Sequence, residues 1–494
     1  MAKLYVFGIG GTGSRVLRAL TMLMASGVEI NSSIDTIVPI IIDPDSANGD
    51  MNRTADILTK YQEIKKPFEN EKSGFFNVKI KTLSQLTGQS QQNVSDNFKF
   101  EINGTHSRKF KDYIGYNSLD NTNKAFLDLL FSQHNLEADM GVGFKGNPNI
   151  GSVVLNQFTK SPEFNQFLAS FSKDDKIFIV SSIFGGTGAS GFPLLLKNLR
   201  EINAADGKAF LVKDAVIGAV TVLPYFKLKP SEDENSEINS SSFLGKTKAA
   251  LAYYERTIVA DKRLNSFYYI GDHDGGMYDN YDGRDKQKNH AHFVELASAL
   301  AIVDFIAESP HLSTANGIAE SPRYKEFGVE SQNGSIAFNS LGTNSFSTIS
   351  KPLSQFALFS LYLKIGLEKA KNSTTTWLEE KENGVPKKFF SDYYFKNNLS
   401  KFIQYFDEWL DEIEHNRPSF KPFNSNVSYN NALEFVEGYK PRKKLGFFNN
   451  ADIGILDGKA NKVYREYSQL SNESKLIRTF YHVTEDVLTE NVGL

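Results

Sequence analysis

The sequence contains no cysteine among its 494 residues, which excludes disulfides, thiolate catalysis and metal sites built on cysteine. It also lacks an excess of either charge: 55 Lys and Arg stand against 58 Asp and Glu, which gives no basic field for nucleic acid. No window of about 18 apolar residues is present, so we expect no membrane segment. An apolar leader introduced by Lys or Arg is missing too, and we therefore expect a cytoplasmic protein.

What the chain does contain is an ordinary globular mixture, with 40% apolar and 23% charged residues and many aromatic side chains. Its first part alternates apolar runs with helical segments, which indicates an α/β fold with a doubly wound parallel sheet. We predict strands at 3–7, 36–42, 176–182, 214–222 and 266–271. We predict helices at 14–25, 122–133, 152–171, 191–203 and 290–308.

Two polar stretches interrupt this pattern. Residues 60–135 are rich in Asn, Gln and Ser and are predicted to be an insertion at the sheet edge, and residues 229–242 are predicted to be a loop. Beyond about residue 310 the predicted elements are mainly helical, at 354–370, 389–413 and 474–488. We therefore expect an α/β domain over 1–308, with a central helix at 289–307, and a mainly helical domain over 309–494.

A glycine-rich loop, GIGGTGSR, lies between the first strand and the first helix. Gly8, Gly10 and Gly13 spell G-x-G-x-x-G, a pattern typical of dinucleotide sites, where glycines let backbone N–H groups approach a phosphate at a helix N-terminus. Close packing of the strand on the helix is the alternative explanation. Asp43 and Asp45 follow the second strand, where an acid contacts the ribose in dinucleotide enzymes.

Two further glycine-rich loops precede helices, in MGVGFKGNPNIG (140–151) and IVSSIFGGTGASG (179–191). A dinucleotide unit needs only one such loop. Three of them at successive strand ends indicate one polyphosphate that is held from several sides, which disfavours NAD.

In combination these motifs resemble the tubulin/FtsZ superfamily. FGGTGASG is similar to its signature loop G-G-G-T-G-[ST]-G, although Phe184 replaces the first glycine. GFKGNPNIG is similar to its gamma-phosphate loop, with matches at Asn147, Pro148, Ile150 and Gly151. IIIDPDSAN and AVTVLPYFKL resemble two further loops of the family. The resemblance covers roughly residues 3–308 and implies a divergent prokaryotic tubulin-like protein with a tubulin-like fold.

The resemblance also implies a site for GTP or GDP, with Mg²⁺ as a possible companion. The residues implied for the phosphates are Gly10, Gly11, Thr12, Gly13, Ser14, Gly143, Lys145, Gly146, Asn147, Gly185, Gly186, Thr187 and Gly188. Asp45 is implied to hold a magnesium-bound water, whereas Asp43, also a candidate at the nucleotide, could instead cap the turn. The residues implied for ribose and base are Asp272, Asn289, His292 and Phe293. A capping asparagine and a core phenylalanine are the alternative for the last group.

FtsZ-like proteins hydrolyse GTP across a subunit interface with an N-x-D-x-x-D loop after the central helix. The corresponding stretch here, ESPHLSTANGIAESPRYKEFG, offers Asn316 and Glu320 at another spacing, and both are candidate catalytic residues. The resemblance implies self-association into filaments with slow GTP hydrolysis. The altered loop favours the alternative, a non-polymerising GTP-binding structural or sensor module. An NAD or FAD oxidoreductase would need an acid–base group beside a nicotinamide, and we find no such constellation.

Overall fold

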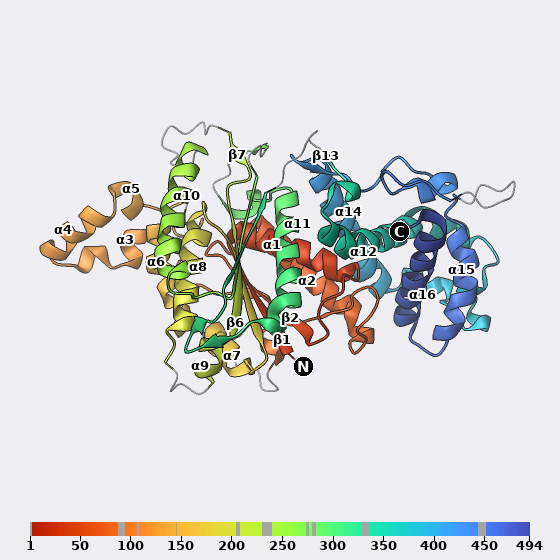
Figure 1. Ribbon diagram of the computed structural model, residues 1–494, viewed down its shortest axis with the longest axis horizontal. Coiled ribbons are helices and arrows are strands. Elements are labelled where there is room, and N and C mark those ends of the chain that lie inside the picture. Colours follow the sequence, from red (N-terminus) through yellow and green to blue (C-terminus); the bar gives the residue numbers. More distant parts are fainter. Residues whose placement is uncertain are drawn as a thin grey trace.

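A computed structural model describes residues 2–86, 94–105, 108–144, 146–203, 208–229, 240–272, 276–278, 283–328, 335–442 and 451–494. Lys145 and most of the predicted loop at 229–242 lie outside the described residues. A parallel sheet with helices on both faces is followed by a mainly helical region (Figure 1). The predicted fold class is therefore confirmed.

Eight described strands form the main sheet, in the order β12-β8-β6-β5-β1-β2-β3, with β4 also beside β2. The strands are β1 (Ala2–Ile9), β2 (Ile34–Ile42), β3 (Lys79–Ile80), β4 (Lys99–Phe100), β5 (Lys176–Ser182), β6 (Val216–Val222), β8 (Ser266–Gly271) and β12 (Arg323–Gly328). Inner strands such as β6, VIGAVTV, are buried along their whole length because helices cover both faces. The chain leaves β1 toward β2 and later returns to β5 on its other side, so the strand order reverses between β1 and β5.

Two layers of helices cover the sheet (Figure 1). One face carries α1 (Gly10–Ala25), α2 (Gly49–Lys65) and α11 (Phe293–Glu308). The other carries α6 (Pro148–Val154), α7 (Pro162–Ser170), α8 (Gly186–Arg200) and α10 (Ser240–Tyr254). None of the helices that the structure describes is long and apolar enough to cross a membrane.

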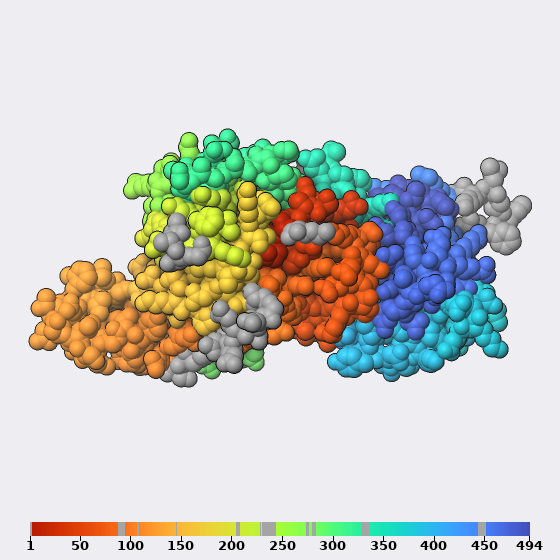
Figure 2. Space-filling view, turned by 90° about the horizontal axis from the view of Figure 1, so that it is seen from below, coloured from red at the N-terminus to blue at the C-terminus, as the bar shows by residue number. Residues whose placement is uncertain are grey.

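The C-terminal third packs beyond α1 and α2, so that α1 is enclosed between the sheet and this region (Figures 1 and 2). Its helices are α12 (Thr343–Leu361), α13 (Leu367–Lys371), α14 (Ser400–Glu414), α15 (Ile455–Val463) and α16 (Asn472–Val487). Aromatic rings fill the junction: Phe76 lies 5.7 Å from Phe356 and 5.1 Å from Phe402 between ring centroids. The many phenylalanines therefore join the two regions into one continuous core.

The domain prediction needs two corrections. β12 pairs with β8, so the sheet continues beyond residue 308. Within 60–135, α2 extends to Lys65 and both β3 and β4 pair with β2, so only a lobe projects from the body (Figure 2). That lobe contains α3 (Phe110–Tyr113), α4 (Asn121–Leu130) and α5 (Gln133–Leu136). Strands of two residues leave no periodic pattern, which is why the sequence did not reveal them.

The predicted helix at 152–171 is divided into α6, a short 3-10 segment and α7. Ser161 caps the second helix, accepting a hydrogen bond from the N–H of Phe164 at 3.1 Å, and Pro162 occupies its first position. A capping serine followed by proline is a helix start signal, so this break was readable in the sequence.

Candidate functional site

The loops that follow β1 and β5 meet at the carboxyl edge of the sheet, where the strand order reverses. A Cβ atom on Gly10 would lie 3.5 Å from Cβ of Thr187 and 3.8 Å from the backbone N of Gly188. Because α1 begins at Gly10 and α8 at Gly186, two helix N-termini converge here. Unpaired N–H groups at helix N-termini attract anions, and such reversal points are the usual ligand sites of doubly wound sheets.

The glycine-rich loop at 140–151, here called the third loop, packs against the one at 179–191, here called the second loop. A Cβ atom on Gly186 would lie 3.0 Å from the backbone N of Gly146 and 3.1 Å from that of Asn147. Gly143 and Gly146 have φ values of +79° and +73°, a backbone conformation that favours glycine. The three loops that the sequence singled out are thus neighbours, with no side chain between Gly186 and the third loop.

Lys246 also contacts the third loop, and the sequence did not indicate it as a residue of the site. From α10 its Nζ donates to the carbonyl O of Gly146 at 2.8 Å, which brings a cation to the third loop. No motif marks this residue, which lies in α10 shortly after the polar stretch at 229–242.

Two glycines of the first loop have a packing role, as the alternative explanation held. A Cβ atom on Gly13 would lie 2.5 Å from the carbonyl C of Gly8, so strand and helix approach too closely for side chains. Ser14 is buried and its hydroxyl donates to the carbonyl O of Gly10 at 3.1 Å. That hydroxyl is already used inside the helix, which corrects the prediction that it reaches a phosphate.

Asp43 and Asp45 both cap the turn after β2. Asp43 Oδ1 accepts from the N–H of Asp45 at 3.0 Å, and Asp45 Oδ1 accepts from that of Ala47 at 3.1 Å. The other Asp45 oxygen accepts from the N–H of Arg284 at 2.5 Å. Burial raises the pKa of Asp43 to about 7, and the nearby Asp45 carboxylate adds to this. With both Asp45 oxygens engaged by backbone N–H groups, these contacts lend no support to its predicted magnesium role.

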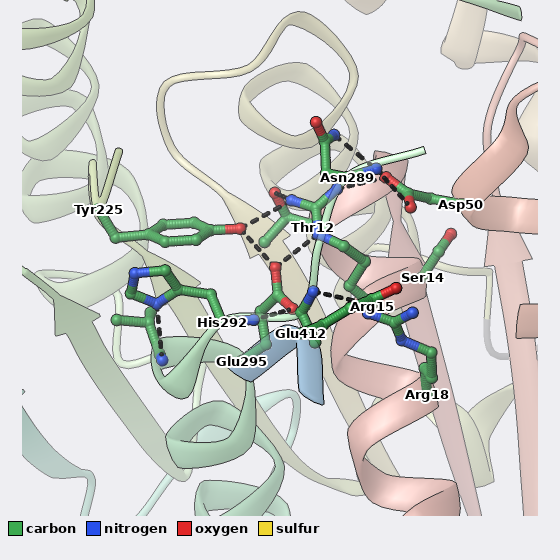
Figure 3. Close-up of polar contacts among 12 residues, drawn as sticks. Thr12, Ser14, Arg15, Arg18, Asp50, Tyr225, Asn289, His292, Glu295 and Glu412 are labelled. Atoms are coloured by element: carbon green, nitrogen blue, oxygen red, sulfur yellow. Dashed lines mark hydrogen bonds and ion pairs between the residues drawn. The ribbon is translucent and has the colours of Figure 1, made fainter. Parts of the chain in front are cut away.

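A buried charge network lies directly beneath the first loop (Figure 3). Arg15, 4% exposed, donates through Nη1 to Asp50 Oδ2 and through Nε to Glu295 Oε1, both at 2.5 Å. Its Nη2 donates to the hydroxyl of Tyr225 at 2.7 Å and lies 3.4 Å from Oγ1 of Thr12. Burial alone would lower the pKa of Arg15, but Tyr225 and the two carboxylates raise it well above its usual range. Arg15 therefore stays charged and fixes α1, α2 and α11 around the loop.

Residues 289–292, here called the pre-α11 segment, lead into α11 beside this network. Asn289 donates its side-chain Nδ2 to Asp50 Oδ2 at 3.2 Å and its backbone N–H to Asp50 Oδ1 at 3.1 Å. These contacts fix the side-chain amide nitrogen of Asn289. The residue itself is only partly buried, so its side chain is accessible. Asp272, predicted to contact ribose or base, follows β8 at the same carboxyl edge of the sheet.

His292 and Phe293 do not face an open site, which corrects the prediction that they contact the base. His292 is fully buried; its Nδ1 accepts from the N–H of Val294 at 3.0 Å, and its Nε2 donates to the carbonyl O of Arg417 at 2.7 Å. Burial lowers the pKa of His292, which favours this neutral form. Phe293 is 2% exposed, and its ring centroid lies 5.2 Å from that of Phe420. The core role that the alternative gave to Phe293 agrees with this burial, whereas the helix cap is His292 and not the asparagine that the alternative named.

The two catalytic candidates lie at the opposite, amino edge of the sheet. Asn316 and Gly317 form the turn of a hairpin between β10 (Thr314–Ala315) and β11 (Ile318–Ala319), with φ values of +51° and +78°. The N–H of Gly317 donates to Asp214, which precedes β6, at 2.8 Å. Glu320 is exposed and accepts from the hydroxyl of Ser313. Since β6 has 7 residues, about 23 Å of strand separates this edge of the sheet from the edge that carries the phosphate loops.

No family model matches the sequence, and no curated protein sequence does so either. Among solved structures the chain is similar to a protofilament of CetZ2 from Haloferax volcanii with GTPγS bound, at 12% identity and a TM-score of 0.29, over 63% of this chain and 59% of that one. It is similar to a GDP-bound monomer of CetZ1 from the same organism at 14% identity and a TM-score of 0.27, over 62% and 58% of the two chains.

A third similar structure is a GTPγS-form protofilament of TubZ from Bacillus thuringiensis serovar israelensis, at 11% identity and a TM-score of 0.28, over 83% of this chain and 82% of that one. The matches span less than two thirds of the two CetZ proteins. All three are tubulin/FtsZ-family proteins, the family that the motifs of this chain resemble. The TM-scores are low, so the site is defined by the geometry of this chain's own loops.

Proposed function

We propose that this chain binds GTP or GDP at the carboxyl edge of its sheet and assembles head to tail into filaments, with slow GTP hydrolysis at the contacts between subunits. The observation that carries the proposal is the meeting of three glycine-rich loops at the point where the strand order reverses. Two helix N-termini, at Gly10 and Gly186, supply N–H groups for phosphate oxygens, and Lys246 supplies a nearby cation. These groups favour a polyphosphate over a neutral ligand.

Guanine is the base we propose, and Asn289 the residue that selects it. Asp50 holds the Asn289 amide nitrogen, so the carbonyl oxygen of that amide remains to accept a hydrogen bond. Guanine offers N–H donors on its Watson–Crick edge where adenine has an unprotonated ring nitrogen. A fixed acceptor therefore favours GTP over ATP.

Hydrolysis across a subunit contact follows from the position of the hairpin. Glu320, at the base of the hairpin whose turn holds Asn316, is too far from the phosphate loops of its own chain to orient a water molecule there. A second copy stacked head to tail would bring an exposed Glu320 to the neighbouring phosphates. In this proposal Glu320 orients the attacking water, while the phosphate loops and Lys246 hold the triphosphate.

The second candidate function is a non-polymerising GTP-binding module. One observation favours this module. Asn316 occupies a turn position with positive φ, so the turn alone explains why an asparagine stands there. Glu320 is then the single residue left for catalysis, which weakens the case for hydrolysis between subunits. Such a module would use bound GTP as a structural part or as a signal within a larger assembly.

Negative-stain microscopy of the purified chain with GTP, with GDP and with a non-hydrolysable GTP analogue separates the two functions. Filaments with triphosphate and few or none with GDP are the expected result. Tight GTP binding with monodisperse particles in every condition would favour the module. A chain that binds neither guanine nucleotide would contradict both.

A further inference from the structure

The end of α14, in the C-terminal region, holds the pre-α11 segment in place. Glu412 Oε2 accepts from the N–H of Ala291 at 2.7 Å, and Asn416 donates its Nδ2 to the carbonyl O of Ala291 at 2.6 Å. The carbonyl O of Arg417 accepts from His292 Nε2. Both backbone groups of Ala291 and the ring of His292 are therefore bound by one short stretch of the C-terminal region.

Glu412 also joins this segment to the two helices at the first loop (Figure 3). Its Oε2 lies 2.9 Å from Nη2 of Arg18 on α1, and its Oε1 lies 2.5 Å from Nη1 of Arg53 on α2. Arg53 in turn donates through Nη2 to the carbonyl O of Asn289 at 2.6 Å. Burial would raise the pKa of Glu412, but the two arginines hold it below its usual range, so Glu412 is ionised at neutral pH.

We propose that Glu412 is a positioning residue for the nucleotide site: from α14 it fixes the pre-α11 segment, so that the affinity for the base depends on the docking of the C-terminal region. This inference rests on the proposed GTP function. Glu412 acts through the backbone of Ala291 and through Arg53, and both contacts end at the residues that carry Asn289. The phosphate loops are also held by contacts that do not involve Glu412, such as the packing of Gly13 on Gly8 and the hydrogen bond from Lys246 to Gly146, so the effect should be confined to the base end of the site.

The test compares Glu412→Gln with a control on the same helix. Asp407 Oδ2 pairs with Lys364 at 2.5 Å and Asp407 Oδ1 accepts from Ser360 at 2.9 Å, contacts that stay within the C-terminal region. Asp407→Asn therefore removes a carboxylate from α14 without touching the pre-α11 segment. Dissociation constants are measured for GTP and for inorganic tripolyphosphate on the full chain, and thermal unfolding without ligand verifies that each variant is folded.

Glu412→Gln should weaken GTP binding by about tenfold, since hydrogen bonds to a charged acceptor are lost, while tripolyphosphate binding changes by less than about twofold. Asp407→Asn should change neither constant. A purely structural role predicts lower thermal stability in both variants with unchanged GTP affinity of the folded protein, and that result would overturn the inference.

Equal losses for GTP and for tripolyphosphate would also overturn it, because the effect would then lie at the phosphates. If the parent chain binds no GTP, the proposed function fails and this inference fails with it. If the parent binds GTP and Glu412→Gln binds it equally well, only the inference fails. Glu412→Asp, which keeps the charge but shortens the side chain, gives the same comparison if the glutamine variant does not fold, with a smaller loss of GTP affinity expected.

Discussion

Replacing Gly186 by valine should fill the space between two of the phosphate loops. An ideal Cβ atom at this position lies 3.0 Å from the backbone N of Gly146 and 3.0 Å from Cβ of Phe144. Ordinary contacts between heavy atoms start at about 3.5 Å, so even a single methyl group forces the third loop to move by about 0.5 Å. Valine adds two more methyl groups at the same place. Gly186 does not have a positive φ, so the conflict is steric and not a matter of backbone strain.

The size of the effect follows from this crowding. Extra methyl groups in a packed site cost about 1–3 kcal/mol. The free protein can relieve the strain by opening the third loop, whereas a bound triphosphate needs both loops in place, so the cost should be expressed as weaker binding. A cost of about 1–3 kcal/mol raises the dissociation constant for GTP by about 5-fold to 150-fold, with Gly186→Ala near the lower end and Gly186→Val near the upper end.

Isothermal titration of the full chain with GTP measures this effect, and a glycine in open space provides the control. Gly458 lies in α15, and a Cβ atom there would meet nothing within 4 Å. Gly458→Ala should leave GTP affinity unchanged and stabilise the fold by about 0.5–1 kcal/mol. If folded Gly186→Val binds GTP as tightly as the parent chain, the phosphates do not lie between these loops and the site assignment is refuted.

Three further predictions concern the base, the hydrolysis and the pH dependence of stability. The parent should bind GTP at least tenfold more tightly than ATP, about 1.4 kcal/mol, and Asn289→Ala should bring the two constants together; equal parent affinities would reject the base contact. Glu320→Gln should slow phosphate release, measured across a protein dilution series, while GTP binding is retained; specific activity independent of concentration would contradict hydrolysis between subunits. Burial lowers the pKa of Lys65 to about 8 from 10.5, so the unfolded chain binds a proton that the folded chain has released, and stability should rise as the pH increases from about 8 toward 10.5. Urea unfolding measures this. Between about pH 7.5 and pH 10 the free energy of unfolding of the parent should rise by about 2 kcal/mol relative to that of Lys65→Met, whereas the same pH dependence in both proteins would disprove the lowered pKa of Lys65.

The parts of the fold that were predictable from the sequence are those with a strong local pattern. The bounds of β5 and β8 agree with the predicted 176–182 and 266–271, because a strand buried on both faces is a continuous apolar run between polar residues. The three glycine-rich loops were likewise visible as local motifs. The hairpin at Asn316 was readable too, since Asn-Gly is the typical dipeptide of a two-residue hairpin turn, although this stretch was interpreted as a candidate catalytic loop.

The polar network beneath the first loop could not be predicted. Arg15 and Glu295 are 280 residues apart, and Arg18 and Glu412 are 394 apart, so no spacing rule connects them. In a chain with 113 charged residues, nothing local distinguishes these four from charges at the surface. The same holds for Ser14, whose hydroxyl turns back to its own helix instead of reaching outward.

The enclosure of α1 between the sheet and the C-terminal region has a consequence for folding during synthesis. Arg18 leaves the ribosome 394 residues before Glu412, and at about 5–20 residues per second this interval lasts roughly 20–80 s. Even after the last strand of the sheet, β12, has been made, the first helix has no C-terminal helices on its other side, so apolar residues there and the buried arginine face water. Nascent chains that end after α11 should therefore depend on chaperones, and nucleotide should bind firmly only after synthesis has passed α14.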